Sequence, residues 1–217
     1  MNSVWEMNAW TLIKIGGPLM FPILLCSLIA MAIVIEKMIY FSSVKTDVRK
    51  LKKDVFDAIK NNRIKESIQI CDQNRSPVAR ILKAGIIKSG SSKEDMKESM
   101  EDVSLFEIPK LESRLSALAT IAHIAPLLGL LGTVAGMIGS FNTIQIRSAA
   151  LNPVTPGDLA GSIGEALLTT VAGLIVAIPT FVAYNYCVSR INQFILDMEK
   201  AATELVNFVG HVTESKL

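Results

Sequence analysis

Apolar residues along the chain gather into three long stretches that contain almost no charge. The first stretch covers residues 15–35, the second residues 115–146 and the third residues 159–189. Glu165 is the one charged residue within these stretches. An α-helix needs about 20 apolar residues to cross the roughly 30 Å hydrocarbon core of a bilayer. The pattern therefore predicts an all-α integral membrane protein with three transmembrane helices.

The polar region between the first two stretches has the periodicity of amphipathic helices. Apolar residues recur at spacings of three and four from Val44 to Asn61, and residues 64–72 continue in the same style. Ser76-Pro77 is typical of a helix start, and Ser92 with Asp95 three residues later resembles a capping box. We expect the helix that begins at Ser92 to continue without interruption into the second span.

A stripe of apolar residues also continues past the third stretch, from Val188 to about Gly210. Its members are Ile191, Ile195, Met198, Ala202, Leu205 and Val209. This stripe predicts that the third span extends beyond the membrane and packs on a neighbouring helix. Two of the three transmembrane helices are thus expected to extend into a helical cytoplasmic domain.

The distribution of positive charge predicts the orientation. Most lysines and arginines lie between residues 42 and 114, and positively charged segments remain in the cytoplasm. The basic residues at 45–53 are best interpreted as a topology anchor, with contact to anionic lipid headgroups as the alternative. Tyr40 and Phe41 mark the inner interface, and Trp5 and Trp10 suit an interfacial anchor at the outer one.

These patterns give a predicted order of segments along the chain. It consists of a periplasmic N-terminal segment (1–15), transmembrane helix 1 (16–41), a cytoplasmic helical domain (42–114), transmembrane helix 2 (115–143), a periplasmic loop (144–160), transmembrane helix 3 (161–188) and a cytoplasmic C-terminal helix (189–217).

Glu165 is the first candidate for a functional residue. An ionised side chain within a span costs roughly 2.5–3.5 kcal/mol or more, so it is expected to face a bundle interior, a partner helix or water. Thr133 and Thr170 could offer hydroxyls to water or an ion, although a single transmembrane threonine more often bonds a carbonyl of its own helix. Thr169 shares a face with Glu165, whereas Thr170 lies about 140° away. Either Glu165 reaches a pore from its edge, or Thr169 also faces it.

Small residues form rows on the second and third spans. They are Gly129, Gly132, Gly136 and Gly139 on the second span, and Ala166, Thr170, Gly173 and Ala177 on the third. Such rows let transmembrane backbones approach closely, so these residues are candidates for helix packing. Pro126 and Pro179 are expected to kink their helices.

No motif indicates an enzyme, a cofactor or a metal site, and nothing points to nucleic acid. The sequence contains no nucleotide-binding loop and no zinc-ligand spacing, and Cys26, Cys71 and Cys187 are best interpreted as reduced. One of the two histidines, His123, is a candidate proton relay; we favour an interfacial histidine hydrogen-bonded to a neighbouring helix. Any energy that the protein uses must therefore come from an ion gradient or a partner.

Two longer motifs resemble the MotA/TolQ/ExbB proton-channel family, specifically its ExbB/TolQ branch. The first is the sequence from Ala125 to Val134, APLLGLLGTV, and the second is that from Ile163 to Leu174, IGEALLTTVAGL. Further matching positions are Gly17-Pro18, Pro22, Glu36-Lys37, Gly136, Phe141, Ala177-Ile178-Pro179 and Tyr184-Asn185. The flagellar MotA branch has four spans and fits less well.

The resemblance implies a ring-shaped homo-oligomer, expected to be a pentamer, in the bacterial inner membrane. The ring would surround single helices of an ExbD/TolR-like partner whose intramembrane Asp carries the proton. Proton flow would then deliver work to a TonB-like or Tol-Pal protein, and Thr133, Glu165 and Thr170 would line the pore. A non-conducting membrane scaffold is the alternative function. A stand-alone transporter is disfavoured because the chain lacks paired broken helices.

Overall fold

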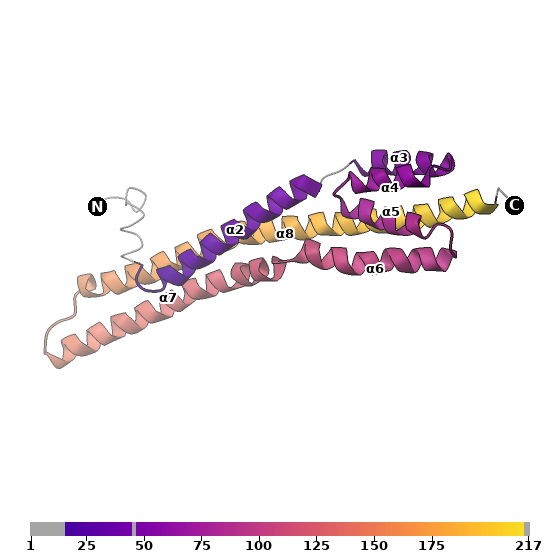
Figure 1. Ribbon diagram of the computed structural model, residues 1–217. Helices are drawn as coiled ribbons and strands as arrows, with labels where there is room; N and C mark the ends of the chain where they lie inside the picture. Colours follow the sequence, from indigo (N-terminus) through magenta and orange to yellow (C-terminus); the bar gives the residue numbers. More distant parts are fainter. Residues whose placement is uncertain (1–15, 45–46, 215–217) are drawn as a thin grey trace. The chain divides into compact units, whose positions relative to one another are not determined.

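The structure is a computed structural model that describes residues 16–44 and 47–214. The described residues form a series of helices without strands (Figure 1). They are α2 (Met20–Val44), α3 (Val48–Lys60), α4 (Ile64–Asp72), α5 (Pro77–Ile87), α6 (Lys93–Glu112), α7 (Leu115–Ala149) and α8 (Pro156–Glu214). The segment with Trp5 and Trp10 and part of the basic cluster at 45–53 lie outside the described residues.

Among the described residues, three helical segments are long and apolar enough to cross a membrane, and they contain α2, α7 and α8. Large apolar side chains on all three point away from the rest of the chain: Phe21 is 67% exposed, Leu127 60% and Ile175 64%. In water such surfaces would aggregate, whereas in a bilayer they face lipid or other helices. The prediction of an all-α protein with three membrane-spanning helices is confirmed at this level.

The chain divides into two compact units. The membrane unit comprises the described residues up to Ile35 and residues Arg114–Asn185, and the polar unit comprises Glu36–Ser113 and the chain from Tyr186 onward. α2 and α8 each contribute to both units, whereas α7 belongs to the membrane unit and α3 to α6 belong to the polar unit.

The helices of the polar unit start where side chains can satisfy free backbone N–H groups. Ser76 accepts a hydrogen bond from the Ala79 N–H at 3.2 Å, and Pro77 follows as the first residue of α5. Ser92 and Asp95 form the expected capping box at the start of α6. Both predicted helix starts are confirmed, because the capping oxygens take up donors that the first helical turn leaves without partners.

The core of the polar unit gathers around one stripe of α8. Its buried members are Cys187, Ile191, Phe194, Met198, Ala201, Leu205 and Val209. The sequence predicted Ile195 and Ala202 as members of this stripe. In the structure the residues one position earlier, Phe194 and Ala201, are buried instead, and Ile195 and Ala202 are only half-buried. Gly85 of α5 lies against this stripe, since a Cβ there would come within 2.7 Å of Leu205 Cδ2.

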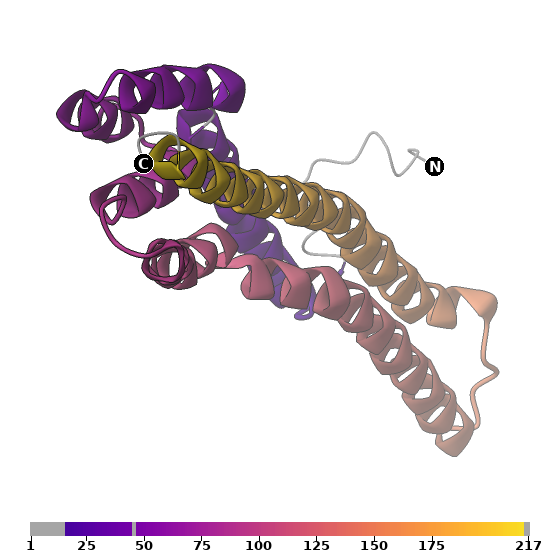
Figure 2. The same cartoon turned by 90° about the vertical axis from the view of Figure 1, so that its right-hand side faces the viewer.

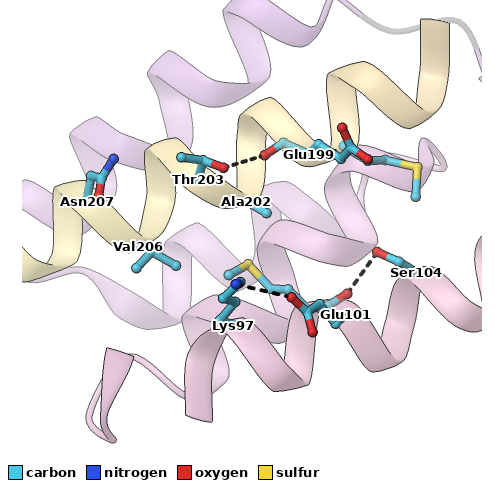
Figure 3. A pocket seen from close by; sticks show the side chains of 10 residues that line it. Lys97, Glu101, Ser104, Glu199, Ala202, Thr203, Val206 and Asn207 are labelled. Carbon is cyan, nitrogen blue, oxygen red and sulfur yellow. Dashed lines mark hydrogen bonds and ion pairs between the residues drawn. The ribbon is translucent and has the colours of Figure 1, made fainter. Parts of the chain in front are cut away.

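A groove of about 360 Å³ runs between α6 and the C-terminal part of α8 (Figure 3). Met100, Met198 and Val206 are among its apolar lining residues. On one rim, Lys97 and Glu101 form an ion pair at 3.6 Å, and both side chains are largely exposed. Exposed pairs of this kind contribute little to stability, so the groove keeps its form through helix packing.

The expected continuous helix from Ser92 into the second span is wrong. α6 ends at Glu112 and α7 begins at Leu115, and between them Arg114 has a left-handed backbone with φ +62°. The break is stabilised by Lys37 of α2, which is only 2% exposed. Its Nζ donates to the Leu111 carbonyl at 2.8 Å and to Ser113 Oγ at 3.3 Å. The lysine thus supplies a donor to a carbonyl at the end of α6, where no further helical turn can provide one.

Replacing Lys37 with methionine should destabilise the polar unit. Lys37→Met keeps much of the apolar stem but removes the donors, leaving the Leu111 carbonyl buried without this partner. We expect the free energy of unfolding to fall by roughly 1–3 kcal/mol. Denaturant unfolding of the full chain in detergent micelles measures the change, with Lys53→Met on the exposed face of α3 as the control. Equal midpoints for the two variants would contradict this role of Lys37.

Candidate functional site

Within the membrane unit, α7 and the first half of α8 run antiparallel and side by side (Figures 1 and 2). Four glycines leave no room for a side chain between the two helices, because real Cβ atoms almost never approach other atoms within 3.0 Å. A Cβ at Gly132 would lie 2.0 Å from Thr169 Oγ1, and one at Gly136 would lie 2.6 Å from Ala166 Cβ. The remaining two positions are Gly129 and Gly173, with nearest atoms at 2.9 and 2.6 Å. The backbones therefore meet along a seam of small residues.

Other predicted packing residues lie less tightly in this seam. A Cβ at Gly139 would lie 3.5 Å from Ser162 Oγ, which is ordinary van der Waals contact. Ala177 is 5% exposed. Sequence reasoning missed Ser162, although it lies one turn before Ala166 on the same row of small residues. That spacing was the signal that could have identified it.

Pro126 and Pro179 both lie inside continuous helices. Each lacks a backbone N–H, so the carbonyls of Ala122 and Ile175, four residues earlier, have no donor from the helical ladder. A kink at either proline stays a prediction.

The hydroxyls of the three candidate threonines, Thr133, Thr169 and Thr170, all bond backbone carbonyls. Thr133 Oγ1 donates to the Leu130 carbonyl at 2.6 Å, within its own helix. Thr169, which is 1% exposed, donates to the Ala166 carbonyl at 2.8 Å, also within its own helix. Thr170 differs, because its shorter contact is with the carbonyl of Gly129 on α7, at 2.9 Å. Thr170 is therefore the threonine that links the two helices through its hydroxyl.

This arrangement leaves the threonine oxygens able to accept further hydrogen bonds. A hydroxyl has one donor and two acceptor lone pairs, and only the donor is engaged with a carbonyl. Thr133 and Thr170 are half-buried, whereas Thr169 lies inside the seam against Gly132. Thr133 and Thr170 can thus accept from a water molecule or from a protonated acid more readily than Thr169 can.

Glu165 lies against the start of the first span. A Cβ added at Gly17 would lie 1.7 Å from Glu165 Oε1, so the two residues are in contact, and Gly17 has φ +66°, a backbone conformation that favours glycine. α2 begins three residues later, at Met20. No pattern in the sequence indicates that these two residues, 148 positions apart, would meet.

His123 has a different partner from the one that we favoured from the sequence. Its Nδ1 is 2.7 Å from the carbonyl of Ala119 on its own helix. Its ring meets the ring of Phe181 on α8 edge-on, with 6.3 Å between centroids. The contact with the neighbouring helix is therefore aromatic, and the hydrogen bond stays within α7.

The turn between α7 and α8 is organised by Asp158. Its carboxylate accepts from the Thr155 N–H at 3.0 Å and the Thr155 hydroxyl at 2.8 Å, and it pairs with Arg147 at the end of α7. The hydrogen bonds from Thr155, together with the Arg147 guanidinium, hold the pKa of Asp158 below its usual range. Asp158 therefore caps the start of α8 and also links it to the end of α7.

Asp158→Asn should remove a pH-dependent part of the stability. Because the folded-state pKa is lowered, the stabilisation is present above the ordinary aspartate pKa of about 3.9 and is lost as the pH falls through the lower folded value. We expect a lower thermal midpoint for the variant at pH 7 and a smaller difference at pH 3. If the thermal midpoints of the variant and the unmodified chain differ equally at pH 7 and pH 3, the destabilisation does not come from the loss of the ion pair and the cap.

Among the described residues, no group of three or more metal-ligating side chains lies close enough together to hold a metal ion. The three cysteines are free. Burial, with a smaller contribution from the neighbouring Asp72, raises the pKa of the Cys71 thiol to about 11. Cys71 is therefore a neutral, unreactive thiol at physiological pH.

Comparison with known proteins identifies one family and two relatives to which this chain is similar. A family model described as the MotA/TolQ/ExbB proton channel family matches residues 73–200. A putative biopolymer transport protein ExbB-like 3 from Synechocystis sp. is 31% identical over 186 residues, which cover 85% of this chain and 88% of that protein. A putative biopolymer transport protein ExbB-like 1 from the same organism is 34% identical over 179 residues, which cover 82% of this chain and 70% of that protein.

Proposed function

The chain belongs to the MotA/TolQ/ExbB proton channel family, and on that premise we propose that it is the ring-forming channel subunit of a proton-driven motor in the bacterial inner membrane. The family makes it a multi-pass membrane protein and a proton-channel-type transport subunit. The observation that carries the finer proposal is the α7–α8 seam, where the Thr170 hydroxyl bonds the Gly129 carbonyl beside the half-buried Thr133.

The exposed faces of the spans support assembly with further helices. Met137 of α7 is 57% exposed and Ile178 of α8 is 62% exposed, on helices that already use their small-residue faces for each other. Neighbouring copies of the chain, a single-span partner and lipid can cover these surfaces. We propose a homopentameric ring around the helices of an ExbD/TolR-like partner.

The chain needs a partner to carry a proton across the bilayer. Glu165 lies near the outer end of the third span, and no carboxylate lies in the central part of any of the three apolar stretches. An Asp on the partner's helix would supply the missing titratable group. In our proposal Glu165 exchanges protons at the periplasmic end, and Thr133 and Thr170 contact the partner's Asp at mid-membrane.

The hydroxyl of Thr170 can serve both protonation states of that Asp. When the Asp is protonated it donates to Thr170 Oγ1, while the Thr170 hydroxyl continues to donate its own proton to the Gly129 carbonyl. When the Asp is ionised it requires donors, so Thr170 must turn its hydroxyl proton from Gly129 to the carboxylate. Thr169 has no such freedom, because its side chain is buried against Gly132. We therefore assign Thr169 to the seam.

The work delivered by proton flow would act on a TonB-like or Tol-Pal protein in the periplasm. The proposed orientation has the N-terminus and the α7–α8 turn in the periplasm and the polar unit in the cytoplasm, in line with the basic residues between 42 and 114. A non-conducting scaffold is the competing function, since a tight seam alone would also serve assembly.

Proton flux into liposomes tests the proposal. The full chain is reconstituted with and without its co-encoded single-span partner, and flux is followed with a pH-sensitive dye. We expect flux only with the partner, a strong reduction in Glu165→Gln, and little change in Asp158→Asn, which neutralises a carboxylate in the adjacent turn. An assembled complex in which Glu165→Gln and the unmodified chain conduct equally would remove Glu165 from the path. Absence of flux from every assembled complex would favour the scaffold.

A further inference from the structure

A pocket of about 320 Å³ lies in the polar unit where four helices meet. Its lining comes from the end of α2, the starts of α3 and α5, and α8. The residues are Val44, Val48, Ser76, Val78, Arg190, Gln193, Phe194 and Asp197. Four apolar residues thus share the lining with one cationic, one anionic and two neutral polar side chains. This composition suits a ligand that has an apolar body and a head with both charges.

The pocket lies at the depth where the apolar spans give way to charge. Val44 is the last residue of α2, and Arg190 is the first charged residue after the third apolar stretch. The Phe194 ring packs against that of Phe41, with centroids 6.0 Å apart. Phe41 is one of the aromatic residues that mark the inner interface. In a bilayer the pocket therefore opens at the level of the cytoplasmic headgroups.

Arg190 is placed to bind a phosphate. Its guanidinium lies over the Phe194 ring, 5.5 Å from the centroid, and the side chain is half-buried. None of the ion pairs found among the described residues involves Arg190. Stacking on an aromatic ring orients the guanidinium, whose N–H donors match two oxygens of a phosphate.

Asp197 supplies the opposite charge at the other end of the pocket. It lies seven residues after Arg190, which is two turns or about 10 Å along the helix axis. Its Oδ1 accepts from Gln193 Nε2 at 3.0 Å, and its other oxygen can accept further donors. Asp197 disfavours a ligand that carries only negative charge, whereas it can bind an ammonium group. The pair therefore matches a phosphate followed by an amine.

We propose that this pocket binds the headgroup of an amine-bearing phospholipid, phosphatidylethanolamine, in the inner leaflet. Arg190 binds the phosphodiester, Asp197 accepts from the ammonium, and the acyl chains leave along the apolar surface of α2. The inference rests on the membrane placement of the chain and not on proton conduction, so a failed flux experiment leaves it standing. Lipid bound here would hold the end of α2 against α8.

Thermal unfolding of the full chain in a neutral detergent tests the site. The probes are short-chain phosphatidylethanolamine, phosphatidylcholine and phosphatidylglycerol of the same acyl length, and inorganic phosphate. We expect phosphatidylethanolamine to raise the unfolding midpoint at a concentration about tenfold lower than the other lipids require, because choline has no N–H donor and the glycerol headgroup has no cation. Inorganic phosphate should give no shift in the same range.

Variants separate the pocket from general lipid binding. Arg190→Gln and Asp197→Asn should each raise the half-maximal concentration of phosphatidylethanolamine at least about tenfold, the factor that corresponds to 1.4 kcal/mol. Lys200→Gln, which neutralises an exposed cation ten residues further along α8, should leave it unchanged. Asp197→Asn is nearly isosteric and keeps the test valid if Arg190→Gln does not fold. Unchanged affinity in Asp197→Asn, tighter binding of phosphatidylglycerol, or an equal shift with inorganic phosphate would overturn the proposal.

Discussion

Thr170→Val should reduce partner-dependent proton flux by about 10- to 100-fold. Valine has nearly the shape of threonine but offers no hydroxyl, so an ionised partner Asp would lose a donor worth about 1.5–3 kcal/mol, and each 1.4 kcal/mol corresponds to a factor of ten in rate. The lost bond to the Gly129 carbonyl removes only about 0.5–1.5 kcal/mol from the fold. The variant should therefore assemble normally but conduct much more slowly, which size-exclusion chromatography and the liposome assay measure together.

Two further substitutions act as controls for that result. Thr170→Ser retains the hydroxyl and should conduct much as the unmodified chain does. Thr169→Val makes the same chemical change one residue earlier, where the hydroxyl bonds its own helix and the side chain is buried against Gly132. We expect a far smaller loss of flux from it. Similar losses in Thr169→Val and Thr170→Val would mean that both act through the seam and would contradict a distinct role for Thr170.

Features that depend on neighbouring residues along the chain could be predicted from the sequence. The near-absence of charge in the three apolar stretches was sufficient to predict the spans, since a charge within hydrocarbon is costly. The caps at Ser76 and Ser92 are local in the same sense, because each involves residues only three positions apart. Interactions between residues close in sequence are sufficient to determine such elements, without tertiary packing.

The break between α6 and α7 could not be predicted in this way. Arg114 adopts a left-handed backbone, which is uncommon for residues other than glycine, and no glycine, proline, asparagine or aspartate adjoins it. What stabilises the break is Lys37, which lies 74 residues before Leu111 in the sequence. A contact between such distant residues depends on how α2 and α6 pack.

The candidate site likewise combines features that could be predicted from neighbouring residues with features that depend on contacts between distant ones. The row of glycines predicted which face of the second span would pack closely, but not the register of α7 against α8. That register pairs Thr170 with Gly129 and Thr169 with Gly132, and so separates two adjacent threonines that the sequence could not distinguish. The contact of Glu165 with Gly17 likewise depends on the placement of the first span, which helical periodicity does not determine.

The second large effect is expected from Gly136→Ala, compared with Gly139→Ala on the same helix. A Cβ at position 136 would lie 2.6 Å from both the Ser162 carbonyl oxygen and Ala166 Cβ, so backbone atoms of α8 would have to move. Overpacking of this kind costs about 1–3 kcal/mol. At position 139 the nearest atom is 3.5 Å away, so alanine fits there and can gain up to about 1 kcal/mol from its better helix propensity.

Unfolding of the full chain by SDS in mixed micelles measures both changes, and proton flux shows their consequence. Gly136→Ala should lower the unfolding midpoint and reduce flux, because displacement of α8 separates the Thr170 hydroxyl from the Gly129 carbonyl. Gly139→Ala should leave both values near those of the unmodified chain. Since the two substitutions make the same chemical change one turn apart, equal effects would mean that the α7–α8 seam does not have the close approach described here. A reduced midpoint with unchanged flux would instead separate seam packing from conduction, and the proposed switching of Thr170 between Gly129 and a partner carboxylate would then be wrong.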